Sequence, residues 1–276
     1  MVDTHGQLAT CDAQWLGAAV PICGLAGDQQ SATIGQGCIG FGETKATYGT
    51  GAFVLTNMGQ EIPRSEHRLL GTVLYQQDGV RTYAIEGSCF VAGSLIQYLR
   101  DQLGLIGSAA ETEDLARSIE DSGEVVIVPA LAGLGAPHWN PDARGVISGL
   151  SFASGRAQIA RAALEAMAHQ THDLASAFAA DGAPWCRLHI DGGMSANDWM
   201  AQDLADILDL EVERHDFVET TALGAAILAA VGCGMQVSLE NAAQAIRGGG
   251  KTFNPQMTGD VREARLARYA RALTAA

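Results

Sequence analysis

Residues 186–208 read CRLHIDGGMSANDWMAQDLADIL, and this stretch decides the fold class. Its first five residues have the length and composition of a short buried strand, and Asp191-Gly192-Gly193 ends that strand with a turn. From Asn197 onward the apolar residues recur at helical spacing as far as Leu208. A strand, a glycine turn and a helix in this order form the repeating unit of an α/β protein.

The same alternation continues outward from this stretch. Upstream, the residue patterns predict strands at 20–25, 43–48, 52–57, 69–76, 81–86, 125–129 and 145–150. Helical patterns occur at 31–36, 94–103, 111–119, 158–180, 221–231, 238–245 and 260–273. The four strands between residues 43 and 86 follow one another along the chain, with the turn Gln77-Asp78-Gly79 before the last, so we expect them to form an antiparallel meander.

We find no internal repeat and no clear linker within the body of the chain. We therefore expect one continuous α/β domain over residues 20–276, with a mixed sheet and helices on both faces, preceded by a linker or leader segment at residues 1–19. A chain of 276 residues is long enough to bury a large core.

Charge and composition exclude several classes of function. The chain has 31 acidic and 17 basic residues, so its net charge is −14. A surface of this sign is repelled by phosphate backbones and anionic headgroups, and we expect neither nucleic acid nor a membrane as a partner. The six scattered cysteines form no CxxC pair, and the first residues do not look like a secretory signal. We therefore predict a cytoplasmic protein with reduced thiols.

Two glycine-rich motifs do not fit the sites that they resemble. Gly35-x-Gly37-x-x-Gly40 matches the dinucleotide fingerprint, but these glycines close a helical stretch instead of following a strand. Gly250-Lys251-Thr252 resembles part of a phosphate-binding loop, but Ala245 stands where that loop needs a glycine. We interpret the second motif as a flexible surface turn.

The histidines and the arginines of the last helix carry weaker signals. The seven histidines lack carboxylate or cysteine partners at metal-ligand spacing, so we predict no metal site and treat the histidines as structural or surface residues. Four arginines recur at helical spacing and are expected to form a solvated face: Arg262, Arg265, Arg268 and Arg271.

A set of short blocks, in a fixed order along the chain, resembles the C-terminal half of the FGGY family of carbohydrate kinases. The blocks are GLAGDQQ at 24–30, TYGTGAF at 47–53, AGSLIQ at 92–97, GLGAP at 133–137, DGGMSAN at 191–197 and ALGAA at 222–226. The stretch from Gly145 to Glu165 looks like the second signature of that family. Together the blocks cover residues 20 to about 234, and TYGTGAF is most similar to the glycerol kinases.

The resemblance implies a ribonuclease H-like fold of the type found in actin and hexokinase. It also implies ATP as cofactor, glycerol as acceptor, and Mg²⁺ bound mainly through ATP and the first half of the family's chain. Family members have two domains and about twice this length, and only the second half is matched here. We therefore expect the isolated chain to have little or no kinase activity.

The residues that would bind the acceptor lie in the first and second blocks. A carboxylate such as Asp28, at the end of a strand and beside glycines, is placed to accept the proton of an alcohol, and the resemblance makes it the catalytic base. By the same resemblance the Gln29 amide binds glycerol, and the Phe53 ring packs on its carbon edge. In isolation, Asp28 reads as a turn cap, Gln29 as a solvated residue and Phe53 as core.

The nucleotide site is implied by five further residues. Glycines beside Thr50 can expose backbone N–H groups and its hydroxyl to phosphate oxygens, although a plain hairpin turn has the same composition. Gly93 and Gln97 share one face at a helix start, and Gly193 and Asn197 repeat that arrangement at another helix N-terminus. The resemblance places all five at ATP.

Three alternatives remain open at this point. The first alternative is a non-catalytic nucleotide-binding or interaction domain. The second is a kinase of another polyol or sugar, and the third is a dehydrogenase built on the glycine fingerprint. The partner could be a complementing N-terminal half or a second copy in a homo-oligomer.

Overall fold

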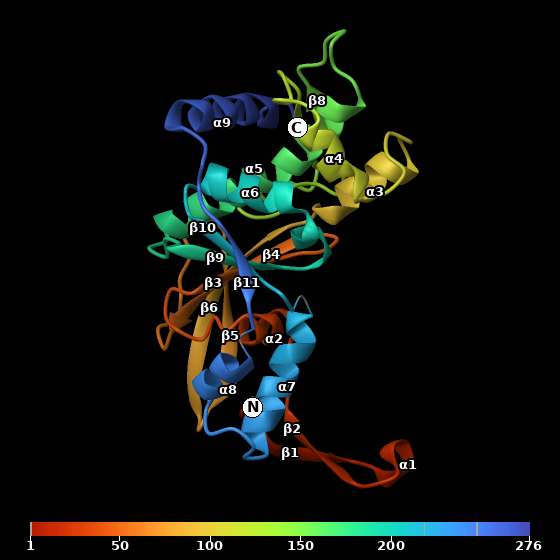
Figure 1. Cartoon of the computed structure of the whole chain (residues 1–276). Coiled ribbons are helices and arrows are strands. Elements are labelled where there is room, and N and C mark those ends of the chain that lie inside the picture. Colours follow the sequence, from red (N-terminus) through yellow and green to blue (C-terminus); the bar gives the residue numbers. More distant parts are fainter. Residues whose placement is uncertain (1, 218, 247) are drawn as a thin grey trace.

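The computed structural model describes residues 2–217, 219–246 and 248–276. At its centre these residues form a mixed seven-stranded sheet in the order β11-β10-β9-β3-β4-β6-β5 (Figure 1). Strand β9 runs parallel to both β3 and β10, and the other neighbouring pairs are antiparallel. The strands are β3 (Thr44–Tyr48), β4 (Ala52–Gly59), β5 (Leu70–Gln77), β6 (Val80–Cys89), β9 (Arg187–Asp191), β10 (Glu211–His215) and β11 (Gly250–Phe253).

The expected meander is wrong in its strand order, because β6 lies between β4 and β5. The burial of the two strands agrees with this order. Ala84, Ile85 and Cys89 are buried in β6 on both of its faces, so both faces of this strand are covered. In β5 only Leu74 and Gln76 are buried, so this strand tolerates the edge of the sheet.

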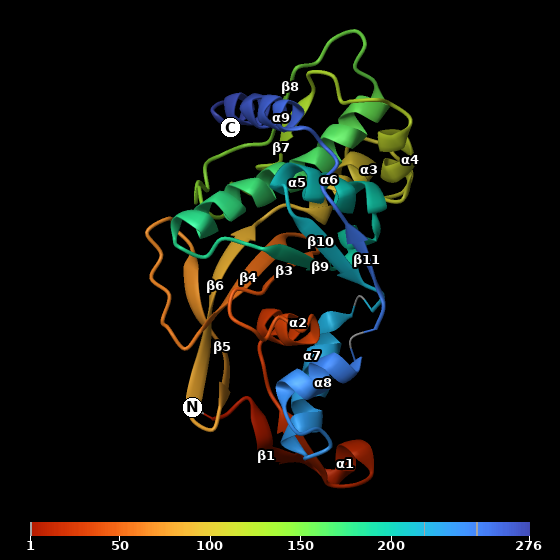
Figure 2. The same ribbon diagram turned by 60° about the vertical axis from the view of Figure 1, so that its left-hand side comes forward.

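Helices cover both faces of the sheet, as predicted (Figures 1 and 2). One layer contains α3 (Gly93–Asp101), α4 (Glu111–Arg117), α5 (Arg156–Ala180), α6 (Asp198–Leu208) and α9 (Gly259–Leu273). The other layer contains α2 (Asp28–Gly35), α7 (Thr220–Gly232) and α8 (Leu239–Ile246). No described helix is long and apolar enough to cross a bilayer.

The main core lies between the sheet and α5. The small side chains of Ala162, Ala163 and Ala166 are buried along that helix and let it approach the strands closely. Tyr48 is fully buried there, and its hydroxyl lies 2.8 Å from the Thr171 hydroxyl. The core therefore fixes the carboxyl end of β3, where the predicted phosphate-binding turn begins.

Two small antiparallel sheets lie outside the central one. Strand β1 (His5–Cys11) pairs with β2 (Val20–Gly24), with α1 (Ala13–Leu16) between them, and β7 (Val126–Val128) pairs with β8 (Val146–Ser148). The strand expected at 20–25 is present as β2, but the prediction that it is buried is wrong, because only Cys23 is buried in β2. Strand β1 falls within the segment predicted as a linker, while the boundary after residue 19 stays a prediction.

Helix α2 is held against α7 by two glycines. A side chain at Gly35 would collide with the Thr220 carbonyl, and one at Gly224 would collide with the Ser31 carbonyl. The backbones of the two helices can therefore touch only because both positions lack a Cβ atom. This contact sets where Asp28, the first residue of α2, lies relative to the sheet.

Two further expectations are corrected at the C-terminal end. Residues 250–252 belong to edge strand β11, which pairs with β10, and do not form a flexible turn. Arg265 is not on a solvated face: it is buried and donates to both carboxylate oxygens of Asp203, at 2.6 and 2.9 Å. Tyr269 and Ala272, four and seven residues further on, are also buried, so Arg265 belongs to the inward stripe of α9.

Candidate functional site

A cavity of about 280 Å³ lies where β3 and β9 end and α3 begins. Four of the five predicted nucleotide residues line it together: Thr50, Gly93, Gln97 and Gly193. They come from three separate segments of the sequence, and the fold brings them to one place. Arg100, which sequence reasoning did not single out, also lines this cavity, and its guanidinium forms an ion pair with the Asp101 carboxylate.

The turn that carries Thr50 is anchored to the start of α3. The Thr50 carbonyl accepts hydrogen bonds from the Ser94 backbone at 3.1 Å and from the Ser94 hydroxyl at 2.9 Å. Gly93 donates to the Gly49 carbonyl at 2.9 Å, and a Cβ at Gly93 would lie 2.6 Å from that oxygen. The carbonyl of Thr50 is thus satisfied within the protein, while the residue itself is exposed.

Gly193, preceded by Gly192, lies at another side of this cavity. A Cβ atom at Gly193 would meet nothing within 4 Å, so the position opens into free space. Gly192 adopts a φ of 83°, and a Cβ there would lie 2.6 Å from the Tyr48 carbonyl oxygen. The strand end of β9 can therefore pass close to β3 only with glycine at 192.

Asn197 has a different environment from the other four residues. Its side-chain oxygen accepts from the Met200 backbone at 2.9 Å, which caps α6, and its amide donates to the Thr112 hydroxyl at 3.2 Å. It is not among the residues that line the cavity. The structure therefore places Asn197 as a helix cap behind the cavity wall, and its contact with a nucleotide stays a prediction.

Asp28 and Gln29 open helix α2 on the other side of the sheet from α5. Asp28 is exposed, and its Oδ1 accepts a hydrogen bond from the Gln29 backbone at 2.8 Å. The second carboxylate oxygen has no protein donor among the described contacts. The Gln29 side-chain oxygen accepts from Lys45 Nζ at 2.5 Å, so the amide is held in one orientation.

Lys45 is the main residue that sequence reasoning missed. It lies on β3 with its side chain fully buried, and Nζ donates to Gln29 and, at 2.9 Å, to the Thr47 hydroxyl. Burial lowers the pKa of Lys45 to about 8, against the opposing effect of the nearby Asp191, Glu86 and Asp28 carboxylates. The signal available in the sequence was a lysine two residues before Thr47 in an alternating strand.

Strand register places Phe53 on the same face as Lys45. Thr47 lies opposite Phe53 in the β3–β4 pair, and Phe53 lies opposite Ser88 in the β4–β6 pair. Residues directly opposite each other project to one face of a sheet, and so do residues two apart on one strand. The predicted acceptor residues on α2 and β4 thus share the face that α2 covers, and the Phe53 ring is 36% exposed there.

Asp191 is a further carboxylate on the α2 face of the sheet. It is paired in register with Thr47, is buried, and accepts a hydrogen bond from the Thr220 hydroxyl through Oδ2. Glu86 also faces this region, and burial raises the pKa of its carboxyl group. Together with Asp28 these carboxylates stabilise the buried ammonium of Lys45.

Comparison with known proteins shows the family of this chain. Residues 44–233 match the FGGY family of carbohydrate kinases, C-terminal domain. A glycerol kinase from Methylobacterium nodulans is 48% identical over 275 residues, which are 98% of this chain and 55% of that protein. One from Rhodospirillum centenum is 51% identical over 265 residues, which are 96% of this chain and 52% of that protein.

Solved structures show the same fold. A crystal structure of Plasmodium falciparum glycerol kinase with ADP superposes with a TM-score of 0.91 at 33% identity, covering 99% of this chain and 55% of that one. A xylulose kinase from Lactobacillus acidophilus shares the fold with a TM-score of 0.82 at 21% identity, covering 98% of this chain and 56% of that one. The chain thus spans about half the length of the relatives that it matches.

Proposed function

This chain belongs to the FGGY family of carbohydrate kinases, and we propose that it is the nucleotide-binding half of an ATP-dependent glycerol kinase. In this proposal, residues 20–276 form the C-terminal domain, and the active cleft closes against an N-terminal half. The similarity to glycerol kinases along 98% of the chain supports glycerol as the acceptor. The likeness to a glycerol kinase that was crystallised with ADP supports ATP as the donor.

One observation carries the proposal: strand β3 connects the residues predicted to bind the acceptor with the turn predicted to bind the phosphates. Its residues Lys45 and Thr47 face α2, where Asp28 and Gln29 lie, and the turn at its end carries Thr50 to the cavity of about 280 Å³. The acceptor alcohol and the phosphate chain would therefore meet at the carboxyl end of a single strand. This is where ligands bind in open α/β sheets.

The chemistry follows from the groups at this strand end. In the transfer step, the alcohol oxygen forms a bond to the γ-phosphorus, the bond from that phosphorus to the bridging oxygen breaks, and ADP leaves. The exposed Asp28 carboxylate would accept the alcohol proton, because one of its oxygens is not used by the described protein donors. Lys45 would fix the Gln29 amide, which then orients the polyol.

The cavity fits a nucleotide in the features that the chain itself supplies. Thr50 offers an exposed hydroxyl, Gly193 opens into free space, and Gln97 provides an amide that can hydrogen-bond a base. Mg²⁺, held mainly through ATP and the N-terminal half, would supply charge neutralisation for the transferred group.

The proposal is tested by restoring a complete cleft. We would join this chain to the N-terminal half of the Methylobacterium nodulans glycerol kinase, whose C-terminal half is similar to it, and measure glycerol-dependent ADP formation. We expect the fusion to phosphorylate glycerol. Replacing Asp28 by Asn, which keeps the shape but removes the base, should lower kcat by about 10²–10⁴-fold.

The matched control is Asp12→Asn, which removes an exposed carboxylate that only caps α1. We expect this variant to keep the kcat of the unmodified fusion. An Asp28→Asn fusion that phosphorylates glycerol as fast as the unmodified one would refute the role of Asp28. A fusion that binds ADP but does not act on glycerol would refute the proposed acceptor.

A further inference from the structure

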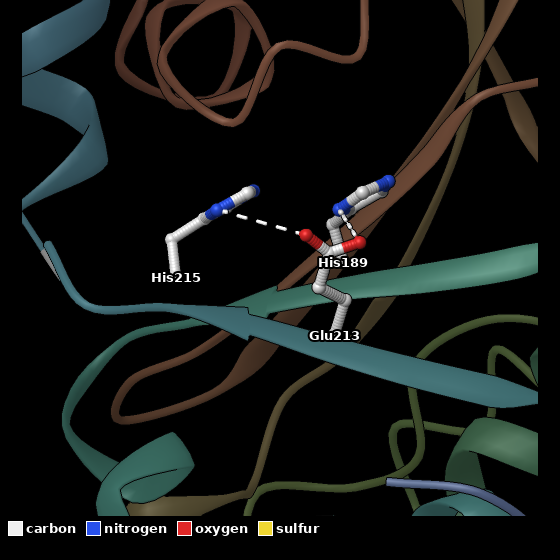
Figure 3. Close-up of side chains that lie close together, drawn as sticks. All are labelled: His189, Glu213 and His215. Atoms are coloured by element: carbon white, nitrogen blue, oxygen red, sulfur yellow. Dashed lines mark ion pairs between the residues drawn. The ribbon is translucent and has the colours of Figure 1, made fainter. Parts of the chain in front are cut away.

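Three potential metal ligands meet on the α2 face of the sheet, at strands β9 and β10. His189 lies directly opposite Glu213 in the parallel β9–β10 pair, and His215 follows Glu213 by two residues on β10. Register therefore projects all three side chains to one face. Figure 3 shows one oxygen of the Glu213 carboxylate turned toward each imidazole ring.

The nitrogen–oxygen distances within this group are closer to those between two ligands of one metal ion than to those of hydrogen bonds. His189 Nδ1 lies 3.8 Å from Glu213 Oε2, and His215 Nδ1 lies 3.8 Å from Glu213 Oε1. Both separations are too long for hydrogen bonds between these atoms. Two ligand atoms at the usual distances from a tetrahedral Zn²⁺ are about 3.4 Å apart, and one ligand atom from each residue lies within 4.8 Å of the others.

The three side chains of this group are largely buried. The side chains of His189, Glu213 and His215 are 5%, 18% and 9% exposed, so an ion bound between them would be largely shielded from water. Arg187 also approaches Glu213, at 3.3 Å, but it makes a closer ion pair of 2.5 Å with Glu211. Arg187 could therefore stay with Glu211 when a metal ion takes Glu213.

Access is provided by a cavity of about 330 Å³ that His189 lines together with Phe41, Thr44 and Cys186. This cavity shares no lining residue with the one beside Thr50. It gives an ion a route from solvent to the imidazole of His189.

From this geometry we propose that His189, Glu213 and His215 bind one first-row divalent metal ion, best matched by Zn²⁺. Two imidazoles and one carboxylate are a donor set that Zn²⁺ takes readily, with water at the fourth position. The ion would link the neighbouring strands β9 and β10. Its role would be to hold these strands together, separately from the proposed phosphoryl transfer at Asp28.

The sequence analysis found no carboxylate or cysteine partner for the histidines at metal-ligand spacing, and the structure brings Glu213 close to two of them from a distant segment. His189 and Glu213 are 24 positions apart, so no local ligand spacing connects them. The pattern Glu-x-His at 213–215 is visible in the sequence, but its meaning depends on a strand that sequence analysis did not predict. Only the parallel pairing of β9 with β10 brings the third ligand into place.

The test uses the whole chain, stripped of metal, with Zn²⁺ alone as the probe. We expect one Zn²⁺ to bind per chain by titration calorimetry, and we expect Zn²⁺ to raise the melting temperature until EDTA removes it. His215→Asn and Glu213→Gln, the second of which preserves shape, should each weaken Zn²⁺ binding by about tenfold or more. His172→Asn, on helix α5 and away from the site, should bind Zn²⁺ as the unmodified chain does.

A second measurement does not depend on the variants folding. Co²⁺ added to the unmodified chain should produce the visible absorption of a low-coordinate nitrogen and oxygen site, and Zn²⁺ should abolish it. Zn²⁺ binding that is equal in the unmodified chain, Glu213→Gln and His215→Asn would overturn the proposal. So would a chain that binds no Zn²⁺ and gives no Co²⁺ absorption.

Discussion

The burial of Lys45 changes its pKa and its contribution to stability. Its ammonium group is removed from water, which costs free energy, and the cost is offset by two hydrogen bonds and three nearby carboxylates. Burial has the larger effect, because it lowers the pKa to about 8 despite those carboxylates. The chain keeps this lysine at a cost in stability, in a position where it orients Gln29.

The first prediction concerns stability against pH. Between about pH 8 and pH 10.5, Lys45 is neutral in the folded chain but still protonated in the unfolded one. The unfolded state then binds more protons, so stability rises with pH. We expect the free energy of unfolding of the unmodified chain to rise relative to Lys45→Met across this window, by on the order of 3 kcal/mol.

The measurement is urea denaturation at several pH values in the same buffer series. Lys251→Met is the matched control, because it removes the only other lysine of the sequence from the exposed edge strand β11. We expect the stability difference between the unmodified chain and this control to stay nearly constant. The same pH dependence for both variants would contradict the argument from burial.

At the scale of elements, the contact between α2 and α7 decides where the catalytic candidates lie. The two helices pack through Gly35 and Gly224 with their backbones in contact. Helix α2 also packs on β3 and β4, and its first residue is Asp28. A displacement of α2 by even one methyl group would therefore move the carboxylate relative to Lys45 and Phe53.

The second prediction follows from this packing. Gly224→Ala places a methyl group against the Ser31 backbone, which cannot move without shifting α2. We expect a loss of about 3 kcal/mol or more in the free energy of unfolding, measured by chemical denaturation. Ala225→Gly, the neighbouring exposed position on α7, should cost only the helix propensity of about 1 kcal/mol. Equal losses would show that the close contact does not matter.

At the scale of the whole molecule, two sets of candidate residues lie at different places on one sheet. The α2 side carries the acceptor residues and the proposed metal ligands, while the cavity at the strand ends carries Thr50, Gly93 and Gly193. Because the chain spans about half the length of its relatives, we expect binding of nucleotide by this half but little phosphoryl transfer.

The third prediction is nucleotide binding by the chain on its own. ADP at about a hundredfold excess over its Kd should stabilise the chain by about 2.7 kcal/mol, which is a rise of about 5 °C in melting temperature. NAD should cause no such rise, because the glycines at 35, 37 and 40 end a helix and continue into a turn. The same sample should form little ADP from ATP and glycerol.

A variant at the cavity wall makes this measurement specific. Gly193→Leu would place an apolar side chain in the space for the nucleotide, and its Cβ would meet nothing within 4 Å. We expect at least about tenfold weaker ADP binding by calorimetry. Unchanged ADP affinity in this variant, or a melting rise with NAD that matches ADP, would contradict a nucleotide site at this cavity.

Most of the helices, the strands near the motif blocks and the family resemblance of those blocks can be predicted from the sequence alone. These features depend on residues close together along the chain, where helical or alternating spacing reports which side is buried. The glycine blocks at 47–53 and 191–197 also identified the turns that later proved to line one cavity.

Three features became visible only in the folded chain: the position of β6 between β4 and β5, the burial of Lys45 and Arg265, and the approach of His189 to Glu213 and His215. Each of these depends on contacts between residues far apart in the sequence. Strand order and register are set by how whole faces pack, and a charged residue is buried only when distant partners compensate for its lost hydration.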